Sequence, residues 1–440
     1  MAPGRGESGL REWTNWAGDQ SCRPAEIARP AGRDELAETI AAAAAAGRKV
    51  SIAGSGHSFT EAAMTDGTMV RVEALRGVQD ADPSSGLVRI GAGTVLADLN
   101  EELAALGLAM ENLGDIDRQT VAGAISTGTH GTGAGLRNLS AQVEGLELVL
   151  ADGRVRQLSA ATHPELLRAA RVGIGALGAI SAVTLRCVPA FTLSRVDTPR
   201  DREEVFATFQ KLADANDHFE LFTFPYADNA LVLERNRTQG SPRPRGPLAA
   251  YLNDVVLENW VLGALSATGK VFPDRIPALS RLAGRLASAS RTTDRSDRVF
   301  ANERRVRFTE MEYAIPREHG PEAARRVIEW VRSNRYPVFF PIEMRVAAGD
   351  DASLSPSHER ATAYIAVHQY RGMQWRPYFE AVEEIMDSYG GRPHWGKRNF
   401  QTAATLSPRY PAWAEFQRAR DELDPGRVFT NAYAARVLGA

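Results

Sequence analysis

The stretch SIAGSGHSFT, residues 51–60, places a histidine inside a glycine-rich turn. The run that leads into it, RKVSIAG (48–54), is rich in β-branched and small residues and predicts a strand. Gly54 and Gly56 remove side chains from the backbone on either side of Ser55, just before His57. Glycines in such a turn allow backbone to approach a ligand closely. We therefore expect this turn to line a binding site.

Strands and helices are mixed on both sides of this turn, which predicts an α+β protein. The pair Asp152-Gly153 inside ELVLADGRVRQL (147–158) predicts a hairpin whose two-residue turn has positive φ at both positions. Farther along, a Pro/Gly/Arg-rich loop (237–247) precedes what reads as a second domain. We predict helices over 33–46, 95–106 and 163–171 and a helical region over 250–290. Strands are predicted over 87–93 and 179–188, and near 305–314, 336–347 and 362–370. A further helix is expected between the strands near 305–314 and 336–347.

A second glycine-rich segment, ENLGDIDRQTVAGAISTGTHGTGAG (111–135), follows the first. Its many glycines and hydroxyls expose hydrogen-bond donors at close range, which suits a pyrophosphate. The apolar residues in VAGAI (121–125) indicate burial and argue against an exposed loop. We expect the two segments to hold one long phosphate-bearing ligand.

The chain contains one G-x-G-x-x-G match, made by Gly173, Gly175 and Gly178. A dinucleotide-binding fingerprint must follow a strand and open a helix, whereas this match follows a predicted helix and opens a predicted strand. We interpret it as a turn that lies against a flat ligand.

The bulk composition limits the classes of function. The chain has 440 residues, 44% of them apolar, and a net charge of −2, so neither nucleic acid nor an anionic membrane is indicated as the main partner. Two cysteines exclude a disulfide framework and a cysteine zinc site. The N-terminus has no apolar signal region and no run of about 18 apolar residues occurs, so we expect a cytoplasmic protein without a membrane span. Peripheral membrane association stays open.

Charged and imidazole side chains recur in three later segments. In FFPIEMRVAAG (339–349), Glu343 and Arg345 share one face of a predicted strand, where an exposed ion pair is the alternative reading. YIAVHQY (364–370) and PHWGKRNF (393–400) carry further candidates. Those candidates are His368 on the first of these segments, and His394 and Lys397 on the second. The side chains of these three segments could line one cavity. His57 belongs to a different segment, and its neutral imidazole could attack the methyl group of an oxidised flavin.

Taken together, the motifs resemble those of the aldonolactone and alditol oxidases, within the vanillyl-alcohol-oxidase flavoprotein superfamily. The motifs that carry the resemblance are GSGHS, VAGAISTGTHGTG, EMR, HWGK and DPGRVF. The resemblance implies a PCMH-type FAD-binding domain of two α/β subdomains over 1–190. It also implies a cap domain with an antiparallel sheet flanked by helices over 191–390, and a segment over 391–440 that returns to the FAD side.

The resemblance also implies roles for individual residues. It implies a covalent bond from His57 to the flavin. No metal is expected, because no histidine pair with the spacing of metal ligands occurs and the two cysteines are far apart. Catalytic or substrate contacts are implied for Asp115, Glu343, Arg345, His368 and Lys397. Cofactor contacts are implied for Gly54, Ser55, Gly56, His57, Ser58, Phe59, Gly114, Asp115, Thr120, Gly123, Thr127, Gly128, Ile180 and His394.

The activity implied by the resemblance is oxidation of a sugar-derived alcohol by hydride transfer to FAD, with O₂ as acceptor and H₂O₂ as product. Asp115 and Tyr370 stand where alditol oxidases have serine and threonine, which favours a lactone of the gulono or arabinono type over a polyol. Gly114 stands where a side chain gates oxygen, which favours an oxidase. The alternatives are a dehydrogenase that uses a quinone or cytochrome, an alditol oxidase, and a non-catalytic flavin- or nucleotide-binding module.

Overall fold

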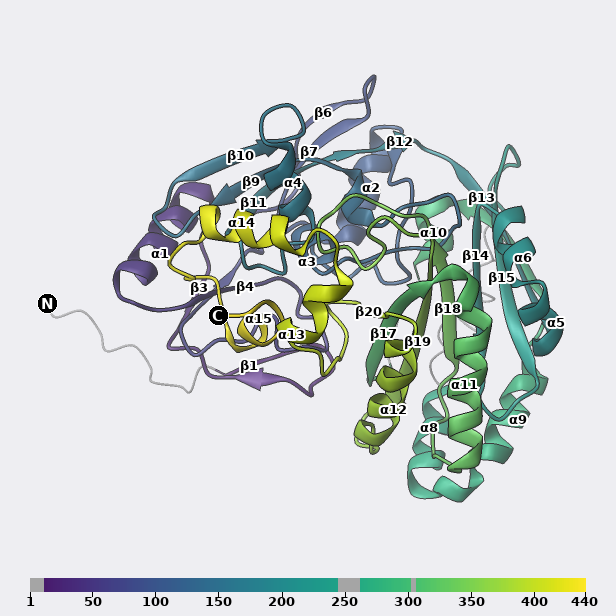
Figure 1. Ribbon diagram of the computed structural model, residues 1–440. Helices are drawn as coiled ribbons and strands as arrows, with labels where there is room; N and C mark the ends of the chain where they lie inside the picture. The colour runs from purple at the N-terminus through teal and green to yellow at the C-terminus, as the bar shows by residue number, and fades with distance from the viewer. Residues whose placement is uncertain (1–11, 244–261, 302–305) are drawn as a thin grey trace, which may run out of the picture.

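The computed structural model describes residues 12–243, 262–301 and 306–440. Figure 1 shows two regions side by side: the purple and blue N-terminal elements with the yellow C-terminal helices, and a teal and green region built on a long sheet. The expected α+β class is confirmed, because parallel and antiparallel sheets both carry covering helices. In the described part of the chain, no helix is both long and apolar enough to cross a bilayer.

A small parallel sheet carries the turn that opened the sequence analysis. Its central strand pairs in parallel with both neighbours, and α1 (Arg33–Ala45) packs beside it through Leu36 and Ile40. The helix starts one residue before Asp34, so Gly32 and not an acidic side chain stands at its N-cap. The strands run in the order β3 (Glu26–Ala28), β5 (Thr68–Arg71) and β4 (Val50–Ala53), next to a short pair formed by β1 (Trp13–Thr14) and β2 (Ser21–Cys22).

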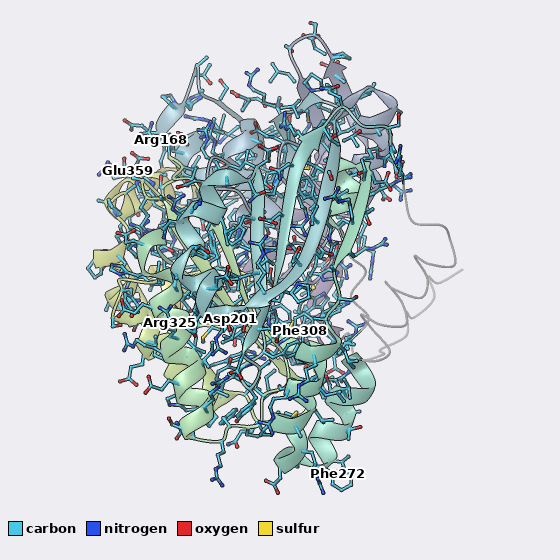
Figure 2. The ribbon with its side chains drawn as sticks, turned by 90° about the vertical axis from the view of Figure 1, so that its right-hand side faces the viewer. Arg168, Asp201, Phe272, Phe308, Arg325 and Glu359 are labelled. Atoms are coloured by element: carbon cyan, nitrogen blue, oxygen red, sulfur yellow. The ribbon has the colours of Figure 1, made fainter. Side chains whose placement is uncertain are left out.

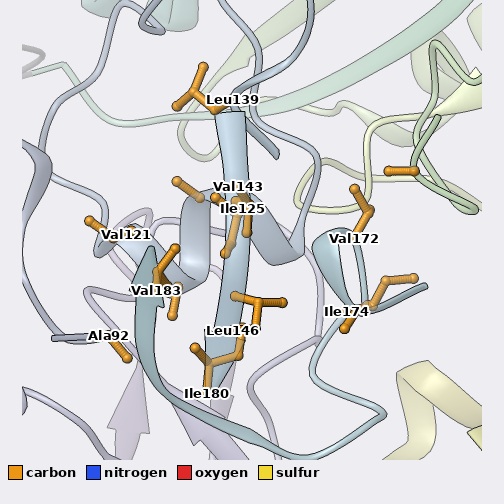
Figure 3. Close-up of a cluster of buried hydrophobic side chains, with 14 of the residues drawn as sticks. Ala92, Val121, Ile125, Leu139, Val143, Leu146, Val172, Ile174, Ile180 and Val183 are labelled. Atoms are coloured by element: carbon orange, nitrogen blue, oxygen red, sulfur yellow. The ribbon is translucent and has the colours of Figure 1, made fainter. Parts of the chain in front are cut away.

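A five-stranded antiparallel sheet follows, and its core holds the second glycine-rich segment. Val121 and Ile125 of α3 (Val121–Ser126) lie among Leu146 and Val183 of the sheet (Figure 3), which confirms the predicted burial. The strand order is β10 (Val155–Ser159), β9 (Val143–Val149), β11 (Ala179–Arg186), β7 (Leu87–Gly91) and β6 (Val78–Asp82), with α2 (Leu96–Ala105), α4 (Pro164–Arg171), the turn η1 (Leu139–Gln142) and the pair β8 (Leu108–Ala109) and β12 (Val188–Pro189) around it.

The predicted hairpin is present, but the prediction that a two-residue turn connects its strands was wrong. β9 and β10 pair as expected, and the chain reverses between Leu150 and Arg154, whose backbone groups bond at 2.9 Å. Only Gly153 has positive φ, whereas Asp152 does not. The Asp152 side chain instead accepts the Arg154 N–H at 3.0 Å, and this local bond stabilises a three-residue loop.

The second region is an eight-stranded antiparallel sheet. One face packs on helices through a core that includes Phe209, Val327, Met344 and Phe379. The other face turns toward the first region. The strand order is β16 (Ser290–Arg295), β13 (Thr192–Asp201), β15 (Asn229–Thr238), β14 (His218–Thr223), β18 (Ile342–Ala347), β19 (Thr362–Tyr370), β17 (Phe308–Pro316) and β20 (Arg392–Pro393). The helices are α5 (Arg202–Ala207), α6 (Phe209–Ala215), α8 (Leu262–Val271), α9 (Ile276–Leu286), α10 (Ser296–Phe300), α11 (Gly320–Ser333) and α12 (Arg376–Asp387), with turns η3 (Pro273–Arg275) and η4 (Arg317–His319).

The last fifty residues connect the two regions. β20 pairs with β17 at the edge of the long sheet, and the chain then runs back to the first region. There the side-chain amide of Asn431 donates to the carbonyl oxygens of Ala62 and Met64, at 2.8 and 2.9 Å. The helices of this segment are α13 (Ala403–Leu406), α14 (Trp413–Leu423) and α15 (Ala432–Leu438), with the turn η5 (Ser407–Arg409). The predicted helix over 250–290 is present as α8 and α9 where it is described, and 244–261 lies outside the described residues.

Candidate active site

A narrow cleft of about 120 Å³ runs through the first region. Both glycine-rich segments line it, which brings them together as the sequence predicted, and the turn at 173–178 closes its far end. Among the residues that the structure describes, His57 is the one titratable side chain that lines it. The predicted cofactor residues on this cleft are Gly54, Ser55, Gly56, His57, Ser58, Thr120, Gly123, Thr127 and Ile180.

Close contact between the two segments explains why residue 54 is glycine. A Cβ on Gly54 would lie 2.2 Å from Oγ1 of Thr120. Thr120 is the N-cap of α3, and its Oγ1 accepts the Gly123 N–H at 3.3 Å. Any side chain at position 54 would therefore displace a capping residue that also lines the cleft.

The turn at 173–178 follows α4 and leads into β11, so the rejection of a dinucleotide fingerprint is confirmed. Gly175 and Gly178 have positive φ, and Ile174 does too, with φ 54°. A Cβ on Gly175 would meet no atom within 4 Å. At Gly175 the turn thus presents open backbone to the cleft.

A second cavity of about 310 Å³ lies between the two regions and shares His57, Ser58 and Gln119 with the first. It brings together residues from strands that are far apart in the chain. The predicted residues that line it are His57, Ser58, Phe59, Gly114, Asp115, Glu343, Arg345, His368, His394 and Lys397. Gly128 lines neither cavity, so its predicted cofactor contact is not supported; a Cβ there would lie 3.1 Å from Cδ of Pro356.

His57 stands where the two cavities meet. Its ring stacks on Trp16, with the ring centroids 5.3 Å apart. Burial, together with the charges of Arg307 and Arg118, lowers the pKa of His57 to about 4. The imidazole is therefore neutral near pH 7, which is the state that a nucleophilic or ligand-bonding role needs.

Arg345 is buried within a cluster of three carboxylates. Its Nε lies 3.0 Å from Oε2 of Glu220 and also contacts Glu343, and its terminal nitrogen is 3.6 Å from Oδ1 of Asp115. Glu220 in turn accepts from Arg235 at 2.6 Å. The exposed ion pair considered from the sequence is therefore wrong, because both Glu343 and Arg345 are buried.

This cluster holds three carboxylates against two guanidinium groups. Burial, with the neighbouring charges of Asp115 and Glu220, raises the pKa of Glu343 to about 7, against the opposing effect of Arg345. Although burial opposes ionisation of Glu220 as well, Arg235 and Arg345 lower its pKa to about 2. Glu343 is thus the carboxyl group of the cluster that gains or loses a proton near neutral pH.

Lys397 is the centre of a second buried cluster. Its Nζ lies 2.6 Å from Oε1 of Glu310 and 2.8 Å from Oε2 of Glu312. Burial alone would lower the pKa of Lys397, but the two carboxylates raise it above its ordinary value. Lys397 therefore remains a cation and cannot serve as a proton acceptor at neutral pH. His368 joins the cluster, with Nε2 3.2 Å from Glu310.

Two further histidines lie beside this cluster. His130 Nε2 lies 3.1 Å from Glu312, while Nδ1 of His394 accepts the Gly396 N–H at 3.0 Å. Burial, with the charge of Lys397, lowers the pKa of His394 to about 3. His130, Glu312 and His394 are spaced like metal ligands, but Lys397 already supplies the positive charge beside Glu312. The absence of a metal stays a prediction.

The sequence analysis missed several of these charged residues. Glu310 and Glu312 alternate with Met311 and Tyr313 along β17, a strand in which every residue but the last is buried. Two acids at period two within an apolar strand are a detectable signal. Glu220, Arg235 and His130 gave no comparable pattern. Pairing between distant strands sets Glu220 opposite Arg345 and places Arg235 on the adjacent strand, while His130 lies in a loop.

The far half of the larger cavity is apolar. Its wall there is formed by side chains of and beside β14 and β15, and by the end of α9. The residues are Phe222, Phe224, Leu231, Leu233, Gly284 and Ala287, with Asn229 and Arg195 among them. The cavity therefore has a charged half and an apolar half on one sheet face.

Comparison with known proteins identifies the family. Residues 183–437 match the family model described as D-arabinono-1,4-lactone oxidase, and residues 24–159 match the FAD-binding domain model. This chain belongs to the D-arabinono-1,4-lactone oxidase family. Like the members of this family, it is an FAD-dependent oxidoreductase, in agreement with the resemblance noted in its motifs.

Relatives cover almost the whole chain. It is 50% identical over 427 residues to L-gulono-1,4-lactone dehydrogenase of Mycobacterium tuberculosis. This alignment covers 97% of this chain and 99% of that protein. It is 32% identical to the alditol oxidase of a Streptomyces strain, with 97% and 98% covered. A structure titled solvent-stable cholesterol oxidase superposes with a TM-score of 0.83 at 19% identity, over 98% of this chain and 97% of that one, and this likeness confirms the expected fold.

Proposed function

We propose that the D-arabinono-1,4-lactone oxidase family member described here oxidises an aldono-1,4-lactone of the gulono or arabinono type. The observation that carries the proposal is the pair of buried charged clusters around Arg345 and Lys397, which face a cavity continuous with the flavin cleft. A sugar lactone presents several hydroxyl groups, and this half of the cavity offers donors and acceptors to match them. A module that only stored flavin would need no such groups.

The cleft suits FAD on chemical grounds. Its lining is glycine, alanine, serine and threonine around the two loops, so a pyrophosphate would meet backbone N–H groups and hydroxyls at close range. The open backbone at Gly175 leaves space for a flat ring at the far end, beside Ile180. When bound, FAD supplies the hydride acceptor. Neutral His57, at the junction of the cavities, is the residue that we propose bonds to the flavin ring.

The residues of the charged half would act on the substrate. As hydride leaves a carbinol carbon, its hydroxyl loses a proton and negative charge grows on the oxygen. Arg345 and Lys397 hold fixed positive charges in a dry site, where such charges stabilise a developing anion best. His368, which Glu310 orients, is the proposed proton acceptor. Glu343 and Asp115 would orient Arg345 and bind substrate hydroxyls.

The electron acceptor divides the proposal in two. Gly114 lines the larger cavity, and a Cβ there would lie 3.3 Å from the His130 carbonyl oxygen, so the position has little spare room. The absence of a side chain at 114 supports access of O₂, with H₂O₂ as product. The alternative is a dehydrogenase, the activity named for the M. tuberculosis relative. Turnover of L-gulono-1,4-lactone in air and, separately, with a dye acceptor under nitrogen distinguishes the two.

The test of the whole proposal is acid denaturation of the purified protein, followed by a search for flavin on the polypeptide. Bound flavin that disappears in His57→Ala, but not in the control His163→Ala outside both cavities, would support the covalent bond. Flavin that is released intact from the unaltered protein would refute the bond and leave FAD binding in place. If anaerobic lactone fails to bleach the flavin, the lactone proposal is wrong.

A further inference from the structure

The two helices α8 and α9 form a hairpin at one end of the long sheet. In Figure 1 they extend below the sheet, and in Figure 2 Phe272, in the turn between them, lies at the lower edge of the molecule. Ile276, Ser280 and Gly284 turn the inner side of α9 toward the protein. The opposite side of α9 and the turn are exposed. We call residues 263–287 the α8–α9 hairpin.

The exposed side of this hairpin is unusually apolar. In the described part of the chain, six large apolar side chains are exposed, and four of them lie here. Val271 and Phe272 are 67% and 60% exposed in the turn, and Leu282 and Leu286 are 47% and 64% exposed one helical turn apart. A cluster of this kind on a protein surface marks a contact site for another molecule.

The same surface is basic. Lys270, Arg275, Arg281 and Arg285 are exposed on the hairpin, against the single carboxylate of Asp274. Four cations and one anion give the hairpin a charge of about +3 on a chain whose net charge is −2. Arg281 and Arg285 lie next to Leu282 and Leu286, so a basic stripe runs beside an apolar stripe along α9. This is the pattern of a helix that lies in the headgroup region of an anionic membrane.

We propose that the α8–α9 hairpin docks this protein on an anionic lipid surface. The apolar side chains would enter the boundary of the acyl chains, while the arginines extend to lipid phosphates. A second copy of the chain is a poorer occupant, because a two-fold contact through this face would set two basic patches against each other. The inference stands without the proposed substrate, since it depends on a surface and not on the reaction.

The helix that carries the exposed apolar side chains also bounds the larger cavity. Gly284 and Ala287 of the same helix line its apolar half, and the Asn229 side chain donates to the Gly284 carbonyl oxygen at 2.6 Å. The hydroxyl groups of a sugar lactone find no hydrogen-bond partners on the wall formed by Phe222 and Leu231. One face of α9 would therefore rest on lipid while its other face bounds the part of the cavity that suits an apolar ligand.

The test is flotation of the full-length holoenzyme with vesicles of phosphatidylcholine, with and without a minority of phosphatidylglycerol. We expect binding only to the anionic vesicles, with loss as salt is raised. Phe272→Ser/Leu286→Ser should weaken binding at least about tenfold. The matched control Leu106→Ser/Val155→Ser removes two exposed apolar side chains elsewhere and should bind as the unaltered protein does. Arg281→Gln/Arg285→Gln should abolish the preference for anionic lipid.

Three results would overturn the proposal. The first is that the unaltered protein fails to float with anionic vesicles. The second is that the hairpin variant and the control variant lose binding equally. The third is that light scattering shows a dimer which Phe272→Ser/Leu286→Ser converts to monomer without any change in flotation. Lactone oxidation in detergent-free buffer, measured on every variant, reports folding independently. Retained oxidation with lost flotation would support the proposal, whereas failed oxidation in the unaltered protein bears only on the proposed function.

Discussion

The glycine-lined cleft and the charged cavity meet at His57, yet they are built in opposite ways. The cleft is lined mainly by three short glycine-rich segments, each continuous in sequence. The charged half of the cavity is formed by single side chains from β14, β17, β18 and β19 and from the segment after β20, and these opposite charges pair with one another. The cleft should therefore be sensitive to added atoms, and the cavity to removed charges.

Removal of the Lys397 charge should have the largest effect on the reaction. Lys397→Met keeps most of the side-chain volume but deletes the cation between Glu310 and Glu312, so we expect kcat to fall by about 10²–10³ with FAD still bound. The measurement is single-turnover reduction of the flavin by lactone. The control is Lys211→Met, an exposed lysine on α6. Turnover near the unaltered rate would remove Lys397 from the site.

Removal of the Arg235 charge should act on stability. Arg235→Met leaves Glu220 buried with only Arg345 to compensate it, and we expect unfolding to become easier by about 3 kcal/mol. Urea denaturation measures this loss. Arg237→Met, two residues along the same strand but exposed, should cost less than about 1 kcal/mol. Equal losses in the two variants would show that burial of the charge is irrelevant.

One added carbon tests the cleft. In Gly54→Ala the new Cβ would lie 2.2 Å from Oγ1 of Thr120, so the capping side chain must move. We expect a roughly tenfold or greater loss in FAD retention during dialysis, because both loops then shift. Gly135→Ala is the matched control, since a Cβ there meets nothing within 4 Å and its φ is not positive. Unchanged retention in Gly54→Ala would mean that the loops yield without consequence.

The smallest effect should be a change in pH dependence. The pKa of Glu343 is raised to about 7, so the folded protein keeps a proton that the unfolded chain releases near its ordinary pKa of 4.5. This group therefore makes folding stability fall as the pH rises from about 4.5 to about 7. Glu343→Gln should abolish that slope, and should also remove an inflection near pH 7 from the profile of kcat/KM. A profile identical to that of the unaltered protein would assign the ionisation elsewhere.

The same contrast explains what the sequence could reveal. Short motifs such as GSGHS and VAGAI carry their backbone chemistry locally, so the cleft was readable, and period-two alternation was enough to put Glu343 and Arg345 on one face. The pairing of β14 with β18 is non-local, and no sequence pattern near Glu220 predicts that it pairs opposite Arg345. The predicted type of turn at Asp152-Gly153 was wrong for a related reason. A side-chain bond to the Arg154 N–H favoured a longer loop over the one that the dipeptide alone suggests.

The course of the last fifty residues has a consequence for how the protein is made. Lys397 and His394 are supplied by the segment after β20, and Asn431 then fastens the chain to the turn region near Met64. On the ribosome, both glycine loops and nearly all of the long sheet emerge before any of these residues. The charged cavity therefore lacks Lys397 until synthesis is nearly finished. A chain that stops early would carry flavin loops without the group that neutralises Glu310 and Glu312, so incomplete copies would be inactive on substrate.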